Sequence, residues 1–358
     1  MVDSFVGAES VRVRSVARTW FCLALAGVVG LAGARTGWGG LLRTQTVELQ
    51  TGWNAVYLEL DPTQKDPALL FAGQPVDVVA AFATPAKGAQ FVRNPTASLL
   101  GSFGWSVWYA PSRSDAFLTS LHAVYGAKPY LIHATTNATL TYSGEFALEA
   151  LVWTPDAYNF VGFTVADPGA PTFQQFFRGS PAHNHNKMYR MVDGTWRQVM
   201  DPSAQAMRAG EAFWIYCDGR SDYPGPLQVS ARSHLGVNLW PDGGDEVVFR
   251  NRADHPLSFQ VEHLVDPAHP VPLSTPVQTM DEAAGGLRTL TVNFDADHFQ
   301  QQFPALEAGA AIRLPLELRS QDAGASLRYS LLKVVTDLGT ISYLPVTTSR
   351  DDEPRPAE

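Results

Sequence analysis

Several short landmarks, most of them with aromatic residues, occur twice along the chain in the same order, and this repeat constrains the fold more than any other feature. The first landmark matches Trp53-Asn54 with Tyr158-Asn159, and the clearest one aligns residues 126–132 with residues 210–216 without a gap. The remaining matches are residues 70–73 with 176–179, residues 105–109 with 188–196, and the closing strands 139–142 with 226–229. The repeat predicts two related modules, which we place at residues 35–145 and 146–234.

Both modules have the pattern of short β-strands. Apolar and polar residues alternate in segments 47–50 and 56–60, and the sequence predicts that Gly52, Trp53 and Asn54 form a turn between them. The chain holds 29 glycines and 25 prolines, a composition that favours many turns over long helices. We therefore expect an all-β fold.

Little helix is expected. Segments 115–122 and 172–177 begin with residues that can cap a helix, and they have apolar residues three or four apart, so each predicts one or two helical turns. Residues 84–101 are rich in Pro, Gly, Ser and Asn and are expected to form an exposed loop inside the first module. Asn54 and Asn159 are interpreted as structural, because an asparagine side chain readily bonds nearby backbone.

Residues 235–348 predict a third domain, an Ig-like antiparallel β-sandwich, followed by a charged, Pro-rich tail at 349–358. Segments 251–256 and 336–339 are predicted to be hairpin loops, and Pro315 and Pro345 are expected on edge or bulged strands. The strand candidates are residues 246–250, 257–262, 287–294, 311–318, 327–335 and 340–346.

The N-terminus has the pattern of an export signal. Arg12, Arg14 and Arg18 precede the apolar run 20–31, and small residues follow at 32–34. The run is shorter than the roughly 20 residues that a spanning helix needs, which favours a signal peptide at residues 1–34 over a permanent membrane anchor. We expect an exported protein in the periplasm, on the cell surface or outside the cell, with no membrane span after cleavage.

After cleavage, Cys217 would be the remaining cysteine, because Cys22 lies in the signal peptide. A single thiol cannot form an internal disulfide, so packing must supply the stability of the mature chain. The formal net charge of -9, without a cluster of basic residues, argues against a nucleic-acid partner.

The search for chemistry finds few patterns. His183 and His185 alternate in a polar segment and are candidate metal ligands, although two ligands do not complete a site. Oxygen-rich segments at 242–246 and 293–298 lack the spacing of an EF-hand. The sequence has no nucleotide-binding loop, zinc-protease pair or hydrolase elbow, so we expect no cofactor and consider an enzyme the weaker interpretation.

Aromatic residues are the remaining candidates for binding. Exposed aromatic faces can stack on sugar rings, but a β module without disulfides also needs large side chains in its core, and the sequence alone leaves both roles open. The aromatic candidates are Trp105, Trp108, Tyr109, Trp196, Trp214 and Tyr223.

The order of these landmarks resembles uncharacterised secreted bacterial proteins with duplicated G-W-N type β modules ahead of an Ig-like β-sandwich. The resemblance rests on Gly52-Trp53-Asn54, residues 126–132, Tyr158-Asn159 and residues 210–216, and Tyr158 departs from the Trp of the first copy. It implies an envelope setting without implying an activity.

The leading hypothesis is a non-catalytic protein that acts through its surfaces in assembly, adhesion or an accessory role, with other envelope or extracellular proteins as partners. The alternatives are a glycan-binding protein that uses the module aromatics and an extracellular hydrolase with dispersed catalytic residues.

Overall fold

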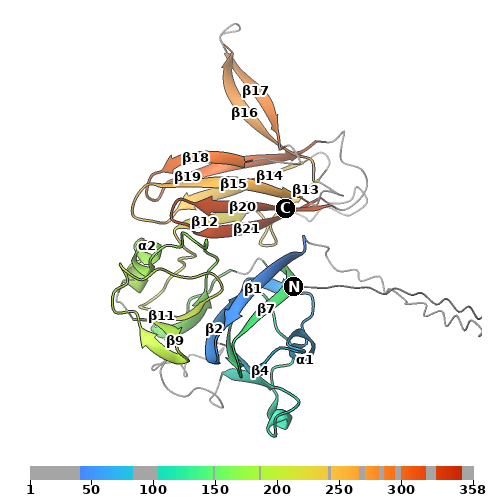
Figure 1. The fold of residues 1–358 in the computed structure, drawn as a ribbon. Coiled ribbons are helices and arrows are strands. Elements are labelled where there is room, and N and C mark those ends of the chain that lie inside the picture. The colour runs from blue at the N-terminus through green and yellow to red at the C-terminus, as the bar shows by residue number, and fades with distance from the viewer. Residues whose placement is uncertain are drawn as a thin grey trace, which may run out of the picture. The chain divides into compact units, whose positions relative to one another are not determined.

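A computed structural model shows a chain that is nearly all β, as predicted (Figure 1). The predicted signal peptide, the expected loop at 84–101 and the C-terminal tail lie outside the described residues. Within the described residues, no helix has the length and apolar character needed to cross a membrane. The structure describes residues 41–83, 104–147, 150–184, 187–240, 243–265, 271–281, 286–294, 300–319 and 328–348.

The first module consists of two antiparallel sheets that enclose one apolar core. The core includes Leu49, Leu58, Ile132 and Leu140, which carry almost no exposed surface. The three-stranded sheet has the order β1 (Arg43–Leu49), β7 (Ala138–Phe146), β3 (Leu60–Pro62), and the four-stranded sheet has the order β2 (Gly52–Leu58), β6 (Lys128–Ala134), β4 (Val76–Phe82), β5 (Trp105–Tyr109). The module also contains the short helix α1 (Pro67–Leu70) and the 3-10 turn η1 (Ala116–Leu118).

The residues predicted to form a turn, Gly52, Trp53 and Asn54, lie instead at the start of a strand. β1 and β2 belong to different sheets, and β2 begins at Gly52 itself. Gly52 has a φ of +97°, which favours glycine and lets the chain pass from one sheet to the other. Asn54 lies within β2, where its side chain bonds the amide and the carbonyl of Gln50 at 2.9 and 2.7 Å. The segment is therefore a crossover between sheets that is fastened by an asparagine.

The second module repeats part of this plan, with α2 (Phe173–Phe177) and the 3-10 turn η2 (Pro181–His183) beside its sheet. The capping box of Thr172 and Gln175 explains why the predicted helical turn forms at α2. The core of the module includes Phe173, Phe177 and Phe213. Its four-stranded antiparallel sheet has the order β10 (Thr195–Gln198), β9 (Met188–Val192), β11 (Ala212–Cys217), β8 (Ala157–Gly162).

Asn159 repeats the role of Asn54. Its Oδ1 accepts a hydrogen bond from the Thr154 amide at 2.8 Å, and its Nδ2 donates to the carbonyls of Thr154 and Ala157. Asn54 likewise donates to the carbonyl two residues before it, at Gly52. The interpretation of both asparagines as structural is confirmed, whereas the duplication of the modules stays a prediction.

Strand register corrects the gapless alignment by one residue. Asn54 faces Ile132 across the β2–β6 pair, and Asn159 faces Ile215 across the β8–β11 pair, so Ile132 corresponds to Ile215 and not to Tyr216. The same offset matches Ala127 with Gly210, and these two residues have positive φ values of 53° and 70°. A left-handed residue before the strand is thus the shared feature, and the glycine at 126 obscures it in the sequence.

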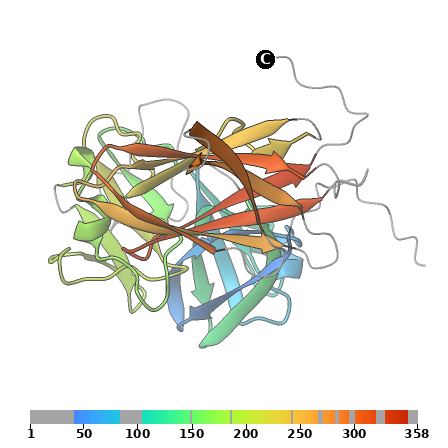
Figure 2. The same cartoon turned by 90° about the horizontal axis from the view of Figure 1, so that it is seen from above.

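The C-terminal domain is an Ig-like sandwich of two five-stranded sheets around one apolar core (Figures 1 and 2). Its strands are antiparallel, except that β13 runs parallel to β21. One sheet has the order β12 (Leu227–Ala231), β14 (Gly244–Asn251), β19 (Ala311–Leu318), β16 (Leu273–Asp281), β17 (Gly286–Asn293). The other has the order β13 (Val237–Leu239), β21 (Ile341–Thr348), β20 (Tyr329–Thr336), β15 (Leu257–Val265), β18 (Gln300–Leu306).

Three details of the predicted sandwich change. β12 was expected to close the second module, but it pairs with β14, and its Leu227 packs into the sandwich core. Segment 251–256 crosses between the two sheets and is not a hairpin loop, whereas 336–339 connects the paired strands β20 and β21 as predicted. β16 and β18 did not appear among the strand candidates.

Both strand prolines lie where one side of the strand has little pairing. β19 pairs with β14 along its length but meets β16 only at Glu317 and Leu318, beyond Pro315. Similarly, β13 pairs with β21 only from Val346 onward, beyond Pro345. A proline cannot donate to a ladder, so it is accommodated where the neighbouring strand is absent.

The asparagine bonds predict a stability difference. We expect Asn159→Ala to lower the free energy of unfolding by about 2 kcal/mol, because it leaves buried backbone groups of Thr154 and Ala157 without partners. Asn54→Ala should cost less, since Asn54 is only half-buried. Urea unfolding measures both effects. Thr154→Ala is the control, because it keeps the backbone groups that Asn159 bonds, and a loss as large as that of Asn159→Ala would contradict the prediction.

Candidate functional site

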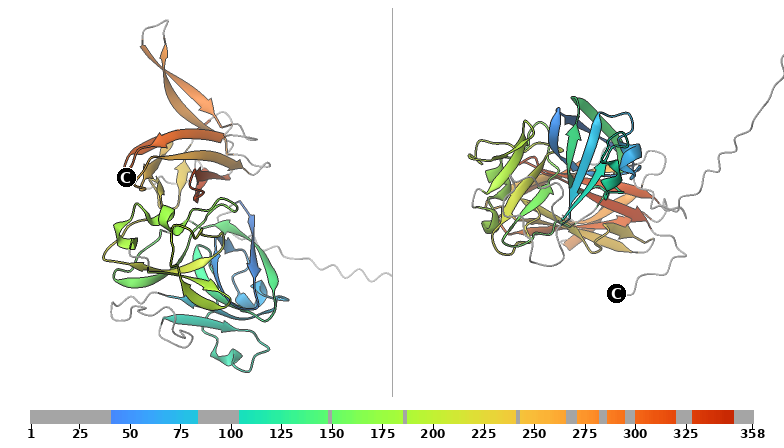
Figure 3. Two further views of the ribbon diagram at one scale, coloured as in Figure 1. Left: turned by 60° about the vertical axis from the view of Figure 1, so that its left-hand side comes forward. Right: turned by 90° about the horizontal axis from the view of Figure 1, so that it is seen from below.

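Most aromatic candidates meet between the two modules. The outer faces of the β2–β6–β4–β5 and β10–β9–β11–β8 sheets contact each other through one apolar cluster, which we call the aromatic interface. Figure 3 shows the first module, in blue to teal, beside the second, in green. The buried members of the interface are Ala55, Val78, Ala80, Val107, Leu131, Phe160, Ala212 and Trp214, and Trp53, Tyr57, Phe82, Trp105, Tyr109, Tyr158, Tyr189, Met191 and Trp196 pack around them.

Trp214 is the centre of this interface. It has no exposed surface, and its ring stacks on Phe160 with a centroid separation of 4.9 Å. Trp105 approaches it edge-on from the first module at 6.4 Å, and Trp196 approaches it at 6.3 Å. The half-buried rings of Trp105 and Trp196 therefore pack on a shared neighbour, and Trp214 has no face left with which to contact a sugar.

The other aromatic candidates are separated from one another. Trp108 is buried in the core of the first module, where it packs on Phe71, and Tyr223 is buried in the second module, where its hydroxyl donates to the carbonyl of Phe176 at 2.6 Å. Tyr109 is half-buried beside the guanidinium of Arg113, which lies 5.6 Å from the centre of its ring. The structure thus joins Trp105, Trp196 and Trp214, places Tyr109 at the margin of the same interface, and assigns Trp108 and Tyr223 to separate cores.

His183, one candidate metal ligand, is buried against the ring of Trp153 at 4.1 Å, and His185 lies outside the described residues. The Nδ1 atom of His183 shares a 2.7 Å hydrogen bond with Ser180 Oγ, and burial lowers the pKa of the imidazole to about 4, so the ring is neutral at pH 7. In the described ranges, no group of three or more His, Cys, Asp or Glu residues is placed to hold a metal ion.

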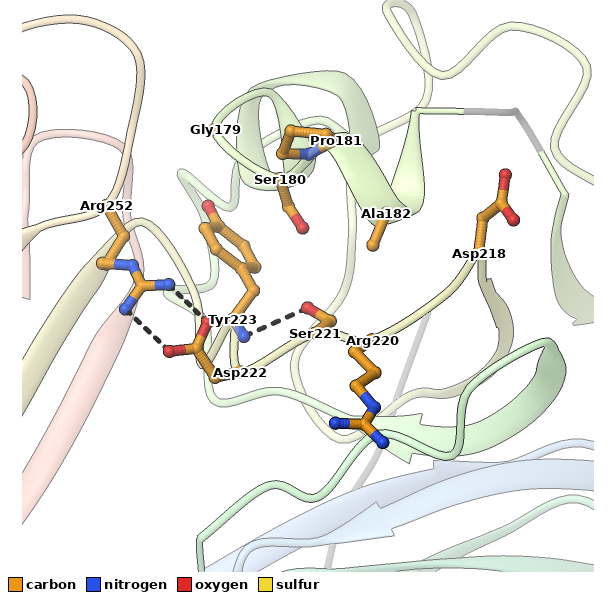
Figure 4. A pocket seen from close by; sticks show the side chains of 10 residues that line it. All are labelled: Gly179, Ser180, Pro181, Ala182, Asp218, Arg220, Ser221, Asp222, Tyr223 and Arg252. Atoms are coloured by element: carbon orange, nitrogen blue, oxygen red, sulfur yellow. Dashed lines mark hydrogen bonds and ion pairs between the residues drawn. The ribbon is translucent and has the colours of Figure 1, made fainter. Parts of the chain in front are cut away.

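A polar pocket of about 330 Å³ lies beside Ser180 (Figure 4). The guanidinium of Arg252 is already held by the Asp222 carboxylate at 2.6 Å, and the Ser221 hydroxyl accepts a hydrogen bond from the Tyr223 amide. Ser180 itself is buried and bonded to His183. Among the residues described here, the pocket brings no carboxylate to the free side of that imidazole, so it does not form a serine triad.

Cys217 is buried, as its apolar segment predicts, and burial raises the pKa of its thiol to about 11. The thiolate is the reactive form, so this cysteine stays protonated and inert at neutral pH.

Sequence reasoning missed a charged cluster on the first module. Asp77 accepts hydrogen bonds from His133 Nδ1 and from Arg113, both at 2.6 Å, and Arg113 also bonds Asp115. Burial opposes ionisation of Asp77, but these two hydrogen bonds outweigh it and lower the pKa of the carboxyl. Trp53 packs edge-on against His133 at 5.0 Å. The cluster fastens β4, β6 and the segment before η1 to one another.

The most distinctive surface is a β-hairpin that projects from the sandwich, formed by β16 and β17 (Figure 3). β16 pairs with β19 only at Leu273 and Ser274, whereas its pairing with β17 runs from Ser274 to Asp281. Beyond Ser274 the hairpin is therefore a two-stranded structure, which we call the β16–β17 ribbon. Sequence reasoning expected a strand at β17 and missed β16, which carries Pro276 and several polar residues.

One face of the ribbon carries an apolar stripe, with Thr275 and Arg288 at its two ends. Val277 lies directly opposite Leu290, and Val292 lies two residues further along the same face. These three side chains expose about two fifths of their surface, at 38%, 40% and 42%. The opposite face carries Gln278, Thr289 and Thr291 instead.

The two edges of the ribbon differ. The amide of Phe294 donates to the carbonyl of Leu273, so these two residues form a hydrogen-bonded pair. In an antiparallel pair, every second residue of a strand directs its N–H and C=O groups to the partner strand, and the residues between them direct theirs outward. On β16, residues 275 and 277 therefore bond β17, and residues 276 and 278 face outward. Pro276 therefore removes an outward donor from the edge of β16. On β17, residues 289, 291 and 293 face outward, and each keeps its N–H group.

No protein-family model and no curated protein matches the chain. Among solved structures, a PapD-like domain of human CEP192 is 10% identical and matches 36% of this chain and 87% of its own, with a TM-score of 0.22. The Salmonella enterica SafA pilin in complex with the SafB chaperone is 15% identical and matches 35% of this chain and 55% of its own, with a TM-score of 0.23. A DUF4785 family protein from Legionella pneumophila is 9% identical and matches 86% of this chain and 93% of its own, with a TM-score of 0.20. Likenesses of this size support no functional conclusion.

The aromatic interface predicts a large stability effect. We expect Trp214→Ala to lower the free energy of unfolding by about 3–5 kcal/mol, because it removes the ring that contacts both sheets and leaves a cavity. Chemical denaturation followed by circular dichroism measures the loss. Phe117→Ala is the matched control, since the Phe117 side chain is 82% exposed and its removal should change stability by less than about 0.5 kcal/mol. Equal effects of the two substitutions would contradict this role for Trp214.

Proposed function

We propose that the protein is a non-catalytic, exported assembly component that acts through its surfaces, and that the β16–β17 ribbon is its principal protein-binding surface. The observation that carries this proposal is that β17 is the last strand of its sheet in the described part of the chain and lies beside an apolar stripe of the ribbon. Export is supported by the signal-peptide pattern of residues 1–34.

The ribbon has the features that strand addition requires. An unpaired edge presents alternating N–H and C=O groups that another extended strand can bond, and the side chains on the two faces supply selectivity. The edge of β16 is blunted by Pro276, so β17 is the side on which a strand can be added with a full set of donors. An apolar stripe beside that edge supplies surface for the partner's side chains to cover.

The occupant we propose is the β17 strand of a second copy of this chain. An antiparallel strand edge is complementary to itself, because a rotation by 180° places identical donor and acceptor rows against each other. In a register with Leu290 opposite Leu290 of the second copy, the outward N–H and C=O groups of residues 289 and 291 of each copy can bond those of the other. This register also places the apolar stripes of the two copies on the same side of the joined sheet. A second copy is a suitable partner because its β17 is also available for pairing, whereas most proteins cover or blunt the edges of their sheets.

The prediction is that the chain from residue 35 onward forms dimers, and that Thr289→Pro converts them to monomers. The amide of Thr289 points outward, so its loss removes a donor from the β17 edge and spares the pairing with β16. Light scattering coupled to size exclusion, over a series of protein concentrations, measures the assembly state.

Gln278→Pro is the matched control. Gln278 lies directly opposite Thr289 in the β16–β17 pair. The substitution therefore also introduces a proline without an N–H group, but on the outer edge of β16 and not on that of β17. We expect this variant to stay dimeric. A wild-type protein that is monomeric at every concentration would overturn the proposal, and so would two proline variants that dissociate to the same degree.

A further inference from the structure

A cavity of about 470 Å³ lies where both modules meet the sandwich, and we call this place the joint. The first module contributes Arg43 and Glu59, the second contributes the backbone at Gly210, and the sandwich contributes Lys333 and Tyr343. The ring of Phe146 stacks on Tyr343 with a centroid separation of 3.6 Å and an interplanar angle of 17°, so the first module and the sandwich are in direct contact here.

Backbone bonds connect the two modules at the same place. The amide of Tyr57 donates to the carbonyl of Gly210 at 2.8 Å. The backbone of Gly210 also lies close enough to the carboxyl of Glu59 to lower the pKa of that group by hydrogen bonding. Gly210 has a φ of +70°, the left-handed conformation that lets its backbone turn toward the first module. Glu59 therefore belongs to the clasp that holds the modules together.

The backbone on either side of Glu59 is fixed by Gln45. The side-chain amide of Gln45 donates to the carbonyl of Tyr57 at 3.0 Å, and its oxygen accepts from the Glu59 amide at 2.8 Å and from the hydroxyl of Tyr142. This network fixes the backbone of Glu59 beside the joint.

Within the described residues the carboxyl of Glu59 forms no ion pair, although Arg43 lines the same cavity. Burial raises the pKa of this carboxyl to about 7, and the hydrogen bond from Gly210 offsets only part of that effect. Other charged and titratable groups also line or border the joint. Lys333 contacts the carboxylate of Glu262 at 3.4 Å, Glu211 pairs with Arg190, and burial raises the pKa of the Tyr343 hydroxyl to about 12. Arg43 lines the cavity from β1.

We propose that Glu59 makes the joint pH-responsive, so that the two modules and the sandwich are clasped when its carboxyl is protonated and loosened when it is ionised. Glu59 is half-buried, and a carboxylate that is largely shielded from water and has no ion pair is costly, so the protein can reduce that cost by admitting more water to the joint. The stabilisation is complete below the ordinary pKa of 4.5 and is lost as pH rises toward 7.

Hydrogen exchange on the full mature chain tests the proposal at the Tyr57 amide, because its bond to Gly210 crosses the joint. After correction for intrinsic exchange, we expect the opening equilibrium constant of this amide to rise by roughly two orders of magnitude between pH 4.5 and pH 7.5. Glu59→Gln imitates the protonated carboxyl and should keep the amide protected at both pH values.

Glu48→Gln is the control, since Glu48 is an exposed carboxylate on β1 of the same module, and this variant should keep the wild-type pH response. A direct titration of the wild-type carboxyl by isotope-edited infrared spectroscopy gives a second readout that does not depend on a variant. The proposal is overturned if the Tyr57 amide opens equally at both pH values, if Glu59→Gln leaves the pH response intact, or if the carboxyl titrates near its ordinary value.

Discussion

The packing of two sheets through Trp214 is the interaction on which the arrangement of the modules depends. Each four-stranded sheet already covers its own module's core with one face, and the aromatic interface covers the other. A strand that is buried on both faces loses the usual alternation of apolar and polar residues. This explains β11, in which the first four residues and Cys217 are all buried. Without a disulfide in the described residues, the modules are held by this layer and by the backbone clasp at Gly210.

The sequence allowed the fold class to be predicted because strand propensity and turn residues are local signals. Which strands pair with each other depends on residues far apart in the sequence, and the wrong predictions concern this pairing. The turn expected between β1 and β2 is a crossover, in which Gly52 and Asn54 direct the two strands to different sheets. The landmark alignment slipped by one residue because a left-handed φ at Ala127 leaves no mark in the residue type. Leu227 was assigned to the second module because proximity in sequence was the available guide, whereas the sandwich core buries it.

The candidate site was harder to predict than the fold for a related reason. A tryptophan in a core and a tryptophan on a binding platform have the same residue type and similar neighbours, so Trp108, Trp214 and Tyr223 could be located only by their burial. The β16–β17 ribbon escaped notice for the opposite reason. It has few apolar residues, and its distinctive property is the outer edge of β17, which pairs with no other strand among the described residues. The proline at 276 was the one available signal, since a proline inside a strand marks an edge.

The ribbon and the sandwich differ in what stabilises them. An isolated pair of strands is marginally stable in water, and in the described part of the chain no third strand pairs with the ribbon beyond Ser274. Adding β17 of a second copy would make a four-stranded sheet, so association would also supply the cooperativity that the ribbon lacks alone. Ordering of the ribbon and dimerisation are then one coupled equilibrium, in which part of the association free energy is spent on ordering the strands. The sandwich core, which is complete without the ribbon's outer half, keeps its stability whether or not the ribbon is paired.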